Sequence, residues 1–190
     1  AHVTLCVCYV TVVVRSRLMN GAEELTLIRN HESDLDSEIG AIAAPAIYDG
    51  LADATYDDDG DIYTGPVAGG NTKLVFTNGV FSAAEPALGG TFWNCAGGPT
   101  PWGTWLSCEE FRNGLVWECD PFKPSQGIAR RALGVFMHEA APVDPLTGFV
   151  YLTEDDYDGR LYRFRPVRYG DLSEGTLEAA AVGAGGAVTW

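Results

Sequence analysis

The chain has 190 residues, of which 46% are hydrophobic, and it carries a formal net charge of −14. This composition indicates one globular domain with a sizeable core and excludes a disordered chain. It also excludes a nucleic-acid-binding surface, which needs clustered Lys and Arg, whereas clustered carboxylates favour a hard cation such as calcium.

The N-terminal part is predicted to contain two strands. Val and Thr dominate residues 3–14, which favours a β-strand, and the run is too short to span a bilayer. No basic region precedes it, as a signal peptide would require. Asn20-Gly21 signals a turn, and residues 25–32 are typical of a strand that ends in polar residues able to bind a ligand.

Residues 33–71 are rich in Asp, Gly and Ala and are predicted to be irregular. Within them, Tyr56–Asp61 looks like a calcium loop, but an EF-hand register would place Pro66 at the twelfth position, where a Glu is needed. A solvated Asp-Gly turn is therefore the better interpretation of this run.

The second half is also predicted to be built from strands. Asn78-Gly79 closes a strand over residues 72–76 and is a strong hairpin signal. Further strands are expected over 114–121, 149–153 and 161–164, with one weak strand in the tail over 175–190. Residues 122–134 are expected to be a connecting loop, after which 135–139 starts the next structural unit. No stretch shows helical periodicity over three turns, so the chain is predicted to be all-β.

The cysteines are too few and too unevenly spaced for a disulfide framework, and no CxxC pair suggests a zinc ribbon. They are Cys6, Cys8, Cys95, Cys108 and Cys119. Because the count is odd, at least one thiol is expected to be free or bound to a metal. Cys95 lies in the loop that leads to the acidic pair Glu109-Glu110, and a thiolate close to carboxylates is typical of a metal site.

A shift of 45 residues places 103–121 over 148–166. In this register Glu109 matches Glu154, Glu110 lies over Asp155, Gly114 matches Gly159, and Trp117 lies over Tyr162. Each copy reads as a strand, an acidic pair, an Asn/Asp-Gly turn and a second strand. His31-Glu32, at the end of an earlier strand, is a third and degenerate copy.

Paired strands that repeat at about 45 residues are typical of β-propeller blades. Equivalent strand ends converge at one mouth of a propeller channel, where the acidic pairs would repel one another unless cations bound between them. The alternative is that each pair is a solvated hairpin end. We predict an all-β, incomplete propeller of about 45-residue repeats with a multi-metal site.

Several motifs resemble those of the PhoX-type alkaline phosphatases, over about residues 22–180. They are Leu27–Glu32, Asn94–Glu110, His138–Ala140, Val143–Pro145, Val150–Asp155 and Gly159–Phe164. The resemblance implies a β-propeller phosphomonoesterase that acts on small phosphate esters and is exported to the periplasm or beyond. It also implies a cluster of ferric iron and calcium at the channel mouth.

The resemblance further implies roles for individual residues. Cys95 would be the thiolate ligand of iron, and Glu110 and Glu139 would supply carboxylates. Glu154 and Asp155 match the corresponding strand end, while Glu32 and Glu109 would be further ligands or their neighbours. His31, His138 and Asn94 would surround the ligands and hydrogen-bond to them or to the core.

Residues 1–21 match nothing expected in this family, so we predict an atypical N-terminal segment followed by a partial propeller domain over 22–190, in a monomer. Such a fragment would keep the motifs and lack the later blades, so a chain made inactive by truncation is the alternative to an active phosphatase. Two other functions stay open, a non-catalytic calcium-binding propeller module and a lactonase-type hydrolase with a calcium in the channel. Cys95 distinguishes the phosphatase from both, since a pure calcium site has no use for a thiolate.

Overall fold

A computed structural model shows an all-β chain and describes residues 11–19, 21–32, 55–56, 62–63, 69–123 and 127–190. Within these ranges there is no α-helix, and the only helical turns are the short 3₁₀ segments η1 (Arg131–Leu133) and η2 (Ala184–Gly186). The predicted fold class is therefore confirmed. Residues 33–54, 57–61 and 64–68 of the stretch predicted to be irregular, which include most of the turn interpreted over Tyr56–Asp61, lie outside the described residues. The described parts of that stretch, residues 55–56, 62–63 and 69–71, lie in strands, so the prediction was wrong there.

The first sheet has the strand order β1-β2-β5-β6 and is antiparallel throughout. Its strands are β1 (Thr11–Met19), β2 (Ala22–His31), β5 (Gly69–Thr77) and β6 (Val80–Thr91). The hairpin expected at Asn78-Gly79 is confirmed, since both residues have positive φ, as a tight two-residue turn requires. The predicted domain boundary between residues 21 and 22 falls at the β1–β2 turn and stays a prediction.

The second sheet has the order β10-β9-β8-β7. Its strands are β7 (Asn94–Pro99), β8 (Trp105–Glu109), β9 (Val116–Cys119) and β10 (Ile128–Ala129). The third sheet has the order β11-β12-β13, from β11 (Val150–Thr153), β12 (Leu161–Arg168) and β13 (Asp171–Ala179). Two small hairpins complete the fold, β3 (Thr55–Tyr56) with β4 (Ile62–Tyr63) and β14 (Ala181–Val182) with β15 (Val188–Thr189).

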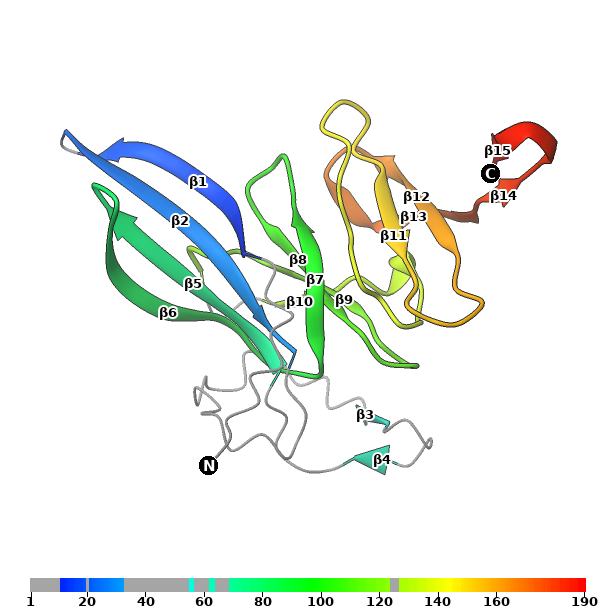
Figure 1. The fold of residues 1–190 in the computed structure, drawn as a ribbon, viewed down its shortest axis with the longest axis horizontal. Coiled ribbons are helices and arrows are strands. Elements are labelled where there is room, and N and C mark those ends of the chain that lie inside the picture. Colours follow the sequence, from blue (N-terminus) through cyan, green and yellow to red (C-terminus); the bar gives the residue numbers. More distant parts are fainter. Residues whose placement is uncertain (1–10, 20, 33–54, 57–61, 64–68, 124–126) are drawn as a thin grey trace.

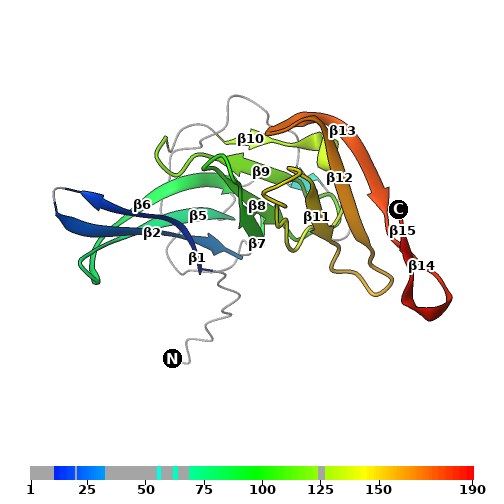
Figure 2. The same ribbon diagram turned by 90° about the horizontal axis from the view of Figure 1, so that it is seen from above.

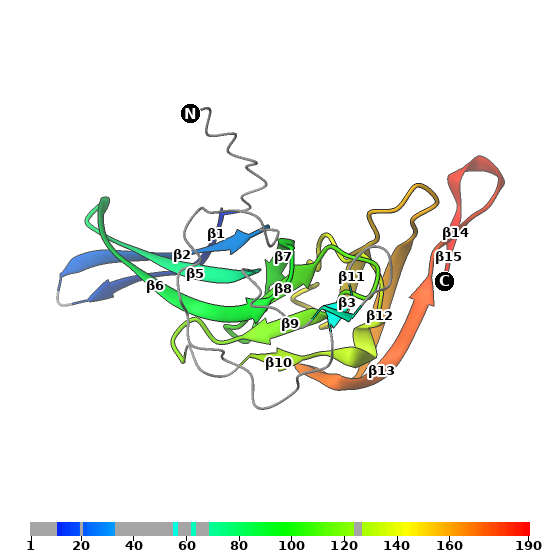
Figure 3. The same cartoon turned by 90° about the horizontal axis from the view of Figure 1, so that it is seen from below.

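The three larger sheets stand side by side in chain order, as blades of an incomplete propeller would (Figure 1). The same order is seen from above and from below, with the second sheet between the other two (Figures 2 and 3). The end of β2 lies against β7, which brings the first and second sheets into contact.

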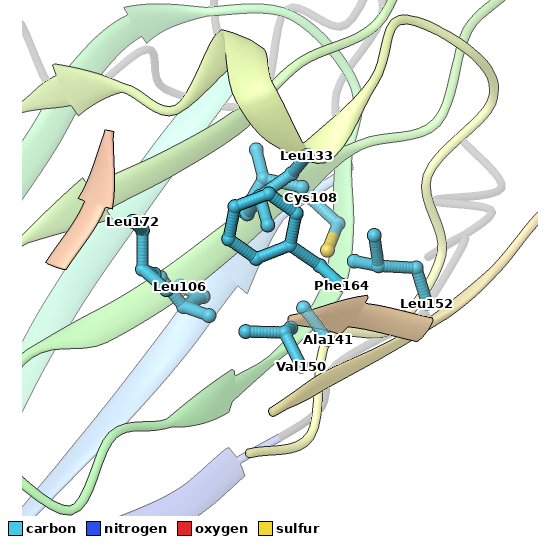
Figure 4. Close-up of a cluster of buried hydrophobic side chains, with 9 residues drawn as sticks. Leu106, Cys108, Leu133, Ala141, Val150, Leu152, Phe164 and Leu172 are labelled. Carbon is cyan, nitrogen blue, oxygen red and sulfur yellow. The ribbon is translucent and has the colours of Figure 1, made fainter. Parts of the chain in front are cut away.

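Two apolar clusters hold the sheets together, one on each face of the second sheet. Between the first and second sheets lie Ile28, Leu88, Trp105, Trp117 and Cys119 with their neighbours. Between the second and third sheets lie Leu106, Cys108, Leu133, Ala141, Val150, Leu152, Phe164 and Leu172 (Figure 4). Since alternate β8 side chains enter opposite cores, both faces of this strand are buried, and every residue of it is apolar or hydrogen-bonded.

Several expectations about secondary structure were wrong. The segment over 122–134, expected to be a connecting loop, contains β10 and η1. The hairpin signal implied a strand after Gly79 but not its length, and β6 extends over 12 residues although its first half is exposed and lacks an alternating pattern. The tail was expected to hold one weak strand, but it contains most of the nine-residue β13 and two further short strands. Cys95 lies in strand β7 rather than in a loop, because the glycine-rich Asn94–Pro99 segment pairs with β8 despite its low β-propensity.

Candidate metal centre

Glu109, the first acid of its pair, stabilises its own hairpin. Its two carboxylate oxygens accept hydrogen bonds from the backbone N–H groups of Phe92 and Leu115, each at 3.0 Å, and the carboxylate also interacts with the Trp117 side chain. The side chain is only 4% exposed. Burial raises the pKa of Glu109 to about 7, against these hydrogen bonds, which lower it.

Glu154 does the same for the hairpin of the third sheet. Its Oε2 accepts a hydrogen bond from the N–H of Arg160 at 3.1 Å and another from the Tyr162 hydroxyl at 2.9 Å. The backbone N–H of Glu154 donates to the Arg160 carbonyl at 3.2 Å, as that of Glu109 donates to Leu115 at 3.0 Å. The 45-residue repeat is thus present in the hydrogen bonds as well as in the sequence.

The two turns are closed by glycines for the same reason. A Cβ on Gly114 would lie 2.1 Å from the Glu109 carbonyl oxygen, and a Cβ on Gly159 would lie 2.3 Å from that of Glu154. Neither position accommodates a side chain without moving backbone. In the third copy, His31 also bonds within its own sheet, since its Nε2 lies 2.6 Å from Thr72 Oγ1 of the neighbouring strand β5. Burial, and then the charge of Arg29, lower the pKa of His31.

The residues at the second position of each pair lie together instead. One ligand atom each from Glu32, Cys95 and Glu110 lies within 4.8 Å of the other two. We call these three residues the ligand group. The third sheet contributes Asp155, whose side chain is hydrogen-bonded to that of Glu110. Each sheet therefore uses its first position to fix a hairpin or strand and its second position to supply a carboxylate.

The electrostatics of the ligand group fit a bound cation. Burial raises the pKa of Glu110 to about 7, and the neighbouring carboxylates of Asp155 and Glu32 raise it further, against a hydrogen bond to Cys95 that lowers it. One oxygen of Glu32 and one of Glu110 are buried and have no hydrogen-bond partner. A buried carboxylate oxygen without a donor is costly, and a metal ion would satisfy both atoms at once.

Cys95 is placed in this group by a β-bulge. Asn94 pairs with Glu109 and Gly97 pairs with Ser107, so β7 has one residue more than β8 between the two pairs. The thiol is only 4% exposed. In contrast, Cys108 and Cys119 are free thiols within the two apolar cores, where burial raises the pKa of each.

The other predicted residues lie around this group. The Glu139 carbonyl accepts a hydrogen bond from Ala96 N–H at 3.1 Å, next to Cys95, but among the described residues its carboxylate does not join the ligand group. Asn94 is fully buried, donates to Ser107 Oγ at 3.0 Å and accepts from Thr91 Oγ1. Neither Glu109 nor Glu154 lies in the ligand group, since both are used by their hairpins.

His138 lies between the second and third sheets. Its backbone N–H donates to the Glu109 carbonyl at 3.0 Å, and it forms a bridge with Glu154. The buried ring lies against Phe136, with the ring centroids 3.7 Å apart. Burial lowers the pKa of His138 to about 4, so the imidazole is neutral at pH 7.

Sequence reasoning missed one polar residue of this region, Asn30. It is fully buried, and its amide bonds to β7 and β8 at the Cys95 bulge. The available signal was its position two residues before Glu32, which places both side chains on one face of the strand end.

Comparison with known proteins identifies one family. A family model described as alkaline phosphatase PhoX matches residues 53–190, which is more than half of the chain. No curated protein and no solved structure matches the chain. Among the described residues we find no helix with the length and hydrophobicity that a membrane span requires.

Proposed function

Because the chain belongs to the PhoX alkaline phosphatase family, we propose that it is a metal-dependent phosphomonoesterase whose ions bind at the ligand group and the carboxylates beside it. One observation carries this proposal. A thiol and two carboxylates from two different sheets have ligand atoms within 4.8 Å of one another, and two of the carboxylate oxygens are buried without a donor.

The donor types indicate which ions would bind. A thiolate is a soft ligand that suits iron, whereas carboxylates suit calcium or ferric iron. Cys95, Glu110 and Glu32 would hold the iron, and Asp155 would extend the carboxylate set toward calcium. Glu139, whose backbone is fixed beside Ala96, is proposed as a further carboxylate of the cluster.

The charge of the protein explains why ions are needed for a phosphate ester. At a net charge of −14 the chain repels a phosphate dianion, and the ligand group adds to that repulsion. When bound, the ions would neutralise the carboxylates, hold the phosphate and stabilise the charge that develops during phosphoryl transfer. The residues of this chain hold the ions, while the hairpins of Glu109 and Glu154 fix the strand ends that present them.

The proposal extends to substrate and location. The substrates are small-molecule phosphate monoesters, the protein acts outside the cytoplasm as a monomer, and residues 22–190 form the propeller domain. Family membership supports the substrate class and the location outside the cytoplasm, while the monomeric state and the domain bounds are proposals of their own.

Elemental analysis and phosphatase assays test the proposal together. The purified chain, supplied with Fe³⁺ and Ca²⁺, is expected to retain both metals and to release p-nitrophenol from p-nitrophenyl phosphate. Cys95→Ser should lose iron and activity and keep calcium, whereas Cys119→Ser, at a free buried thiol of the apolar core, should keep both metals. Binding of calcium without iron, together with no phosphate release, would instead indicate the non-catalytic calcium module.

A further inference from the structure

Every hydrogen-bond donor and acceptor of the Asn30 side-chain amide has a partner at the Cys95 bulge. Its Nδ2 donates to the backbone carbonyl of Cys95 at 3.1 Å and to that of Ala96 at 2.6 Å. Its Oδ1 accepts from Trp105 Nε1 and from Ser107 Oγ, both at 3.1 Å. An amide offers two donors and one oxygen with two lone pairs, so nothing of this side chain is left unused.

These four bonds fix the orientation of the amide. Indole nitrogen only donates and backbone carbonyls only accept, so rotating the amide by 180° would place donor against donor and acceptor against acceptor. The side chain is fully buried, where unmatched polar atoms are costly. The Asn30 side chain therefore has one orientation, which is set by β7 and β8 together.

The bulge needs such a partner. The extra residue of β7 leaves Cys95 and Ala96 out of the register with β8, and Asn30 Nδ2 donates to the backbone carbonyl of each. On the other side, Ala96 N–H donates to the Glu139 carbonyl at 3.1 Å. The backbone that carries the thiol is thus held between β2 and the segment around Glu139.

The position of Asn30 on β2 connects this support to the ligand group. Glu32 directly follows β2, which ends at His31, so the same strand end supplies this carboxylate and the amide that bonds at the Cys95 bulge. A metal site tolerates ligand displacements of only about 0.5 Å. A single strand end thereby sets the distance between one carboxylate and the thiol.

We propose that Asn30 is a positioning residue that holds the Cys95 thiol in the ligand group. The proposal rests on the metal-dependent function proposed above, and it adds a residue that does not itself bind the ion. Loss of residues that orient metal ligands typically weakens metal binding by about 10- to 100-fold. We expect a loss of this size for Asn30→Ala.

Asn71 provides a matched control. It pairs directly with Asn30 in the β2–β5 ladder and is also buried, with 1% exposure. Its Nδ2 donates to Cys119 Sγ at 3.4 Å, in the apolar core between the first and second sheets. Asn71→Ala therefore removes a buried amide at the same depth without touching the bulge.

The first measurement uses Co²⁺, because a thiolate bound to this ion gives an absorption band in the near ultraviolet. The band is expected in the wild type and in Asn71→Ala, and Cys95→Ser should abolish it. Asn30→Ala should weaken it severalfold, with Co²⁺ affinity lowered about 10- to 100-fold. A wild-type band and affinity in folded Asn30→Ala would overturn the proposal.

The second measurement needs no metal. Alkylation by iodoacetamide, followed by mass spectrometry at each cysteine, should show faster reaction of Cys95 in Asn30→Ala and of Cys119 in Asn71→Ala. Asn30→Asp, which keeps the shape and loses both donors, gives the same test if Asn30→Ala does not fold. An unchanged Cys95 rate in both variants would overturn the positioning role, whereas a wild type that binds no Co²⁺ would overturn the proposed metal centre instead.

Discussion

The neighbouring residues Glu109 and Glu110 should respond in opposite ways to the same substitution. Glu109 accepts backbone hydrogen bonds that close its hairpin, while Glu110 lies among other carboxylates in the ligand group. We therefore expect Glu109→Gln to destabilise the metal-free protein, and Glu110→Gln to leave its stability unchanged or to increase it.

The expected loss of stability in Glu109→Gln follows from the two hydrogen bonds that the Glu109 carboxylate accepts. The Phe92 and Leu115 N–H groups bond to different oxygens, both at 3.0 Å, and a Gln has only one oxygen to offer. One buried N–H then loses its acceptor, which costs about 1–3 kcal/mol. Gln also avoids the desolvation that raises the pKa of Glu109 to about 7, so the loss should fall in the lower half of that range.

For Glu110 the substitution removes a partly buried charge next to Asp155 and Glu32, so the cost of burial and the repulsion, which together raise its pKa, disappear with it. A bound ion changes the comparison. At a free Co²⁺ concentration of 100 times Kd, binding should stabilise the wild type by about 2.7 kcal/mol. Glu109→Gln should keep this increment, and Glu110→Gln should lose most of it.

Urea unfolding followed by far-ultraviolet circular dichroism measures both effects, first in EDTA and then with Co²⁺. The two variants differ from the wild type by the same chemical change at adjacent positions, so each controls for the other. Equal destabilisation of the two metal-free variants, or loss of the metal increment in Glu109→Gln, would refute the division of roles between the first and second acids.

Two further predictions concern the second copy of the hairpin and a buried thiol. Tyr162→Phe removes the hydroxyl that donates to Glu154 at 2.9 Å and should lower the free energy of unfolding by about 1 kcal/mol in urea titrations, while Tyr157→Phe, at a fully exposed ring, should change nothing. Equal stabilities of the two variants would contradict the equivalence of the two hairpins. Burial, and then the charges of Glu118 and Asp120, raise the pKa of Cys119 from 9.0 to about 12. The stability that the neutral buried thiol contributes is therefore present below pH 9 and is lost as the pH rises toward 12. Over this pH window the free energy of unfolding of the wild type should fall by about 1.4 kcal/mol per pH unit more than that of Cys119→Ala. Parallel curves of unfolding free energy against pH would contradict this prediction.

The sequence alone determined the fold class, the repeat and the family. Turn signals such as Asn78-Gly79 act within a few residues, so they specify a hairpin wherever the flanking residues favour strands. The equivalence of Glu109 with Glu154, and of Gly114 with Gly159, was also visible, because each hairpin is closed by bonds within about six residues. Such local requirements leave a pattern that can be read without the rest of the chain.

The edge strands could not be predicted in the same way. Most of β13 is exposed, and so is the first half of β6, so neither carries the alternation that a half-buried strand shows. β7 is rich in glycine because other backbone atoms approach it closely, and a Cβ on Gly97 would lie 1.8 Å from the Leu106 carbonyl oxygen. This closeness belongs to the packing and not to the propensity of the segment.

Only the tertiary structure decided which acid of each pair faces the ligand group. The sequence left Glu109 open as a ligand or a neighbour of one, since strand alternation sends adjacent side chains to opposite faces without saying which face belongs to which core. The packing of the second sheet between two apolar clusters made that choice. It also brought Asn30 to the Cys95 bulge across 65 residues of chain, a contact that no local pattern encodes.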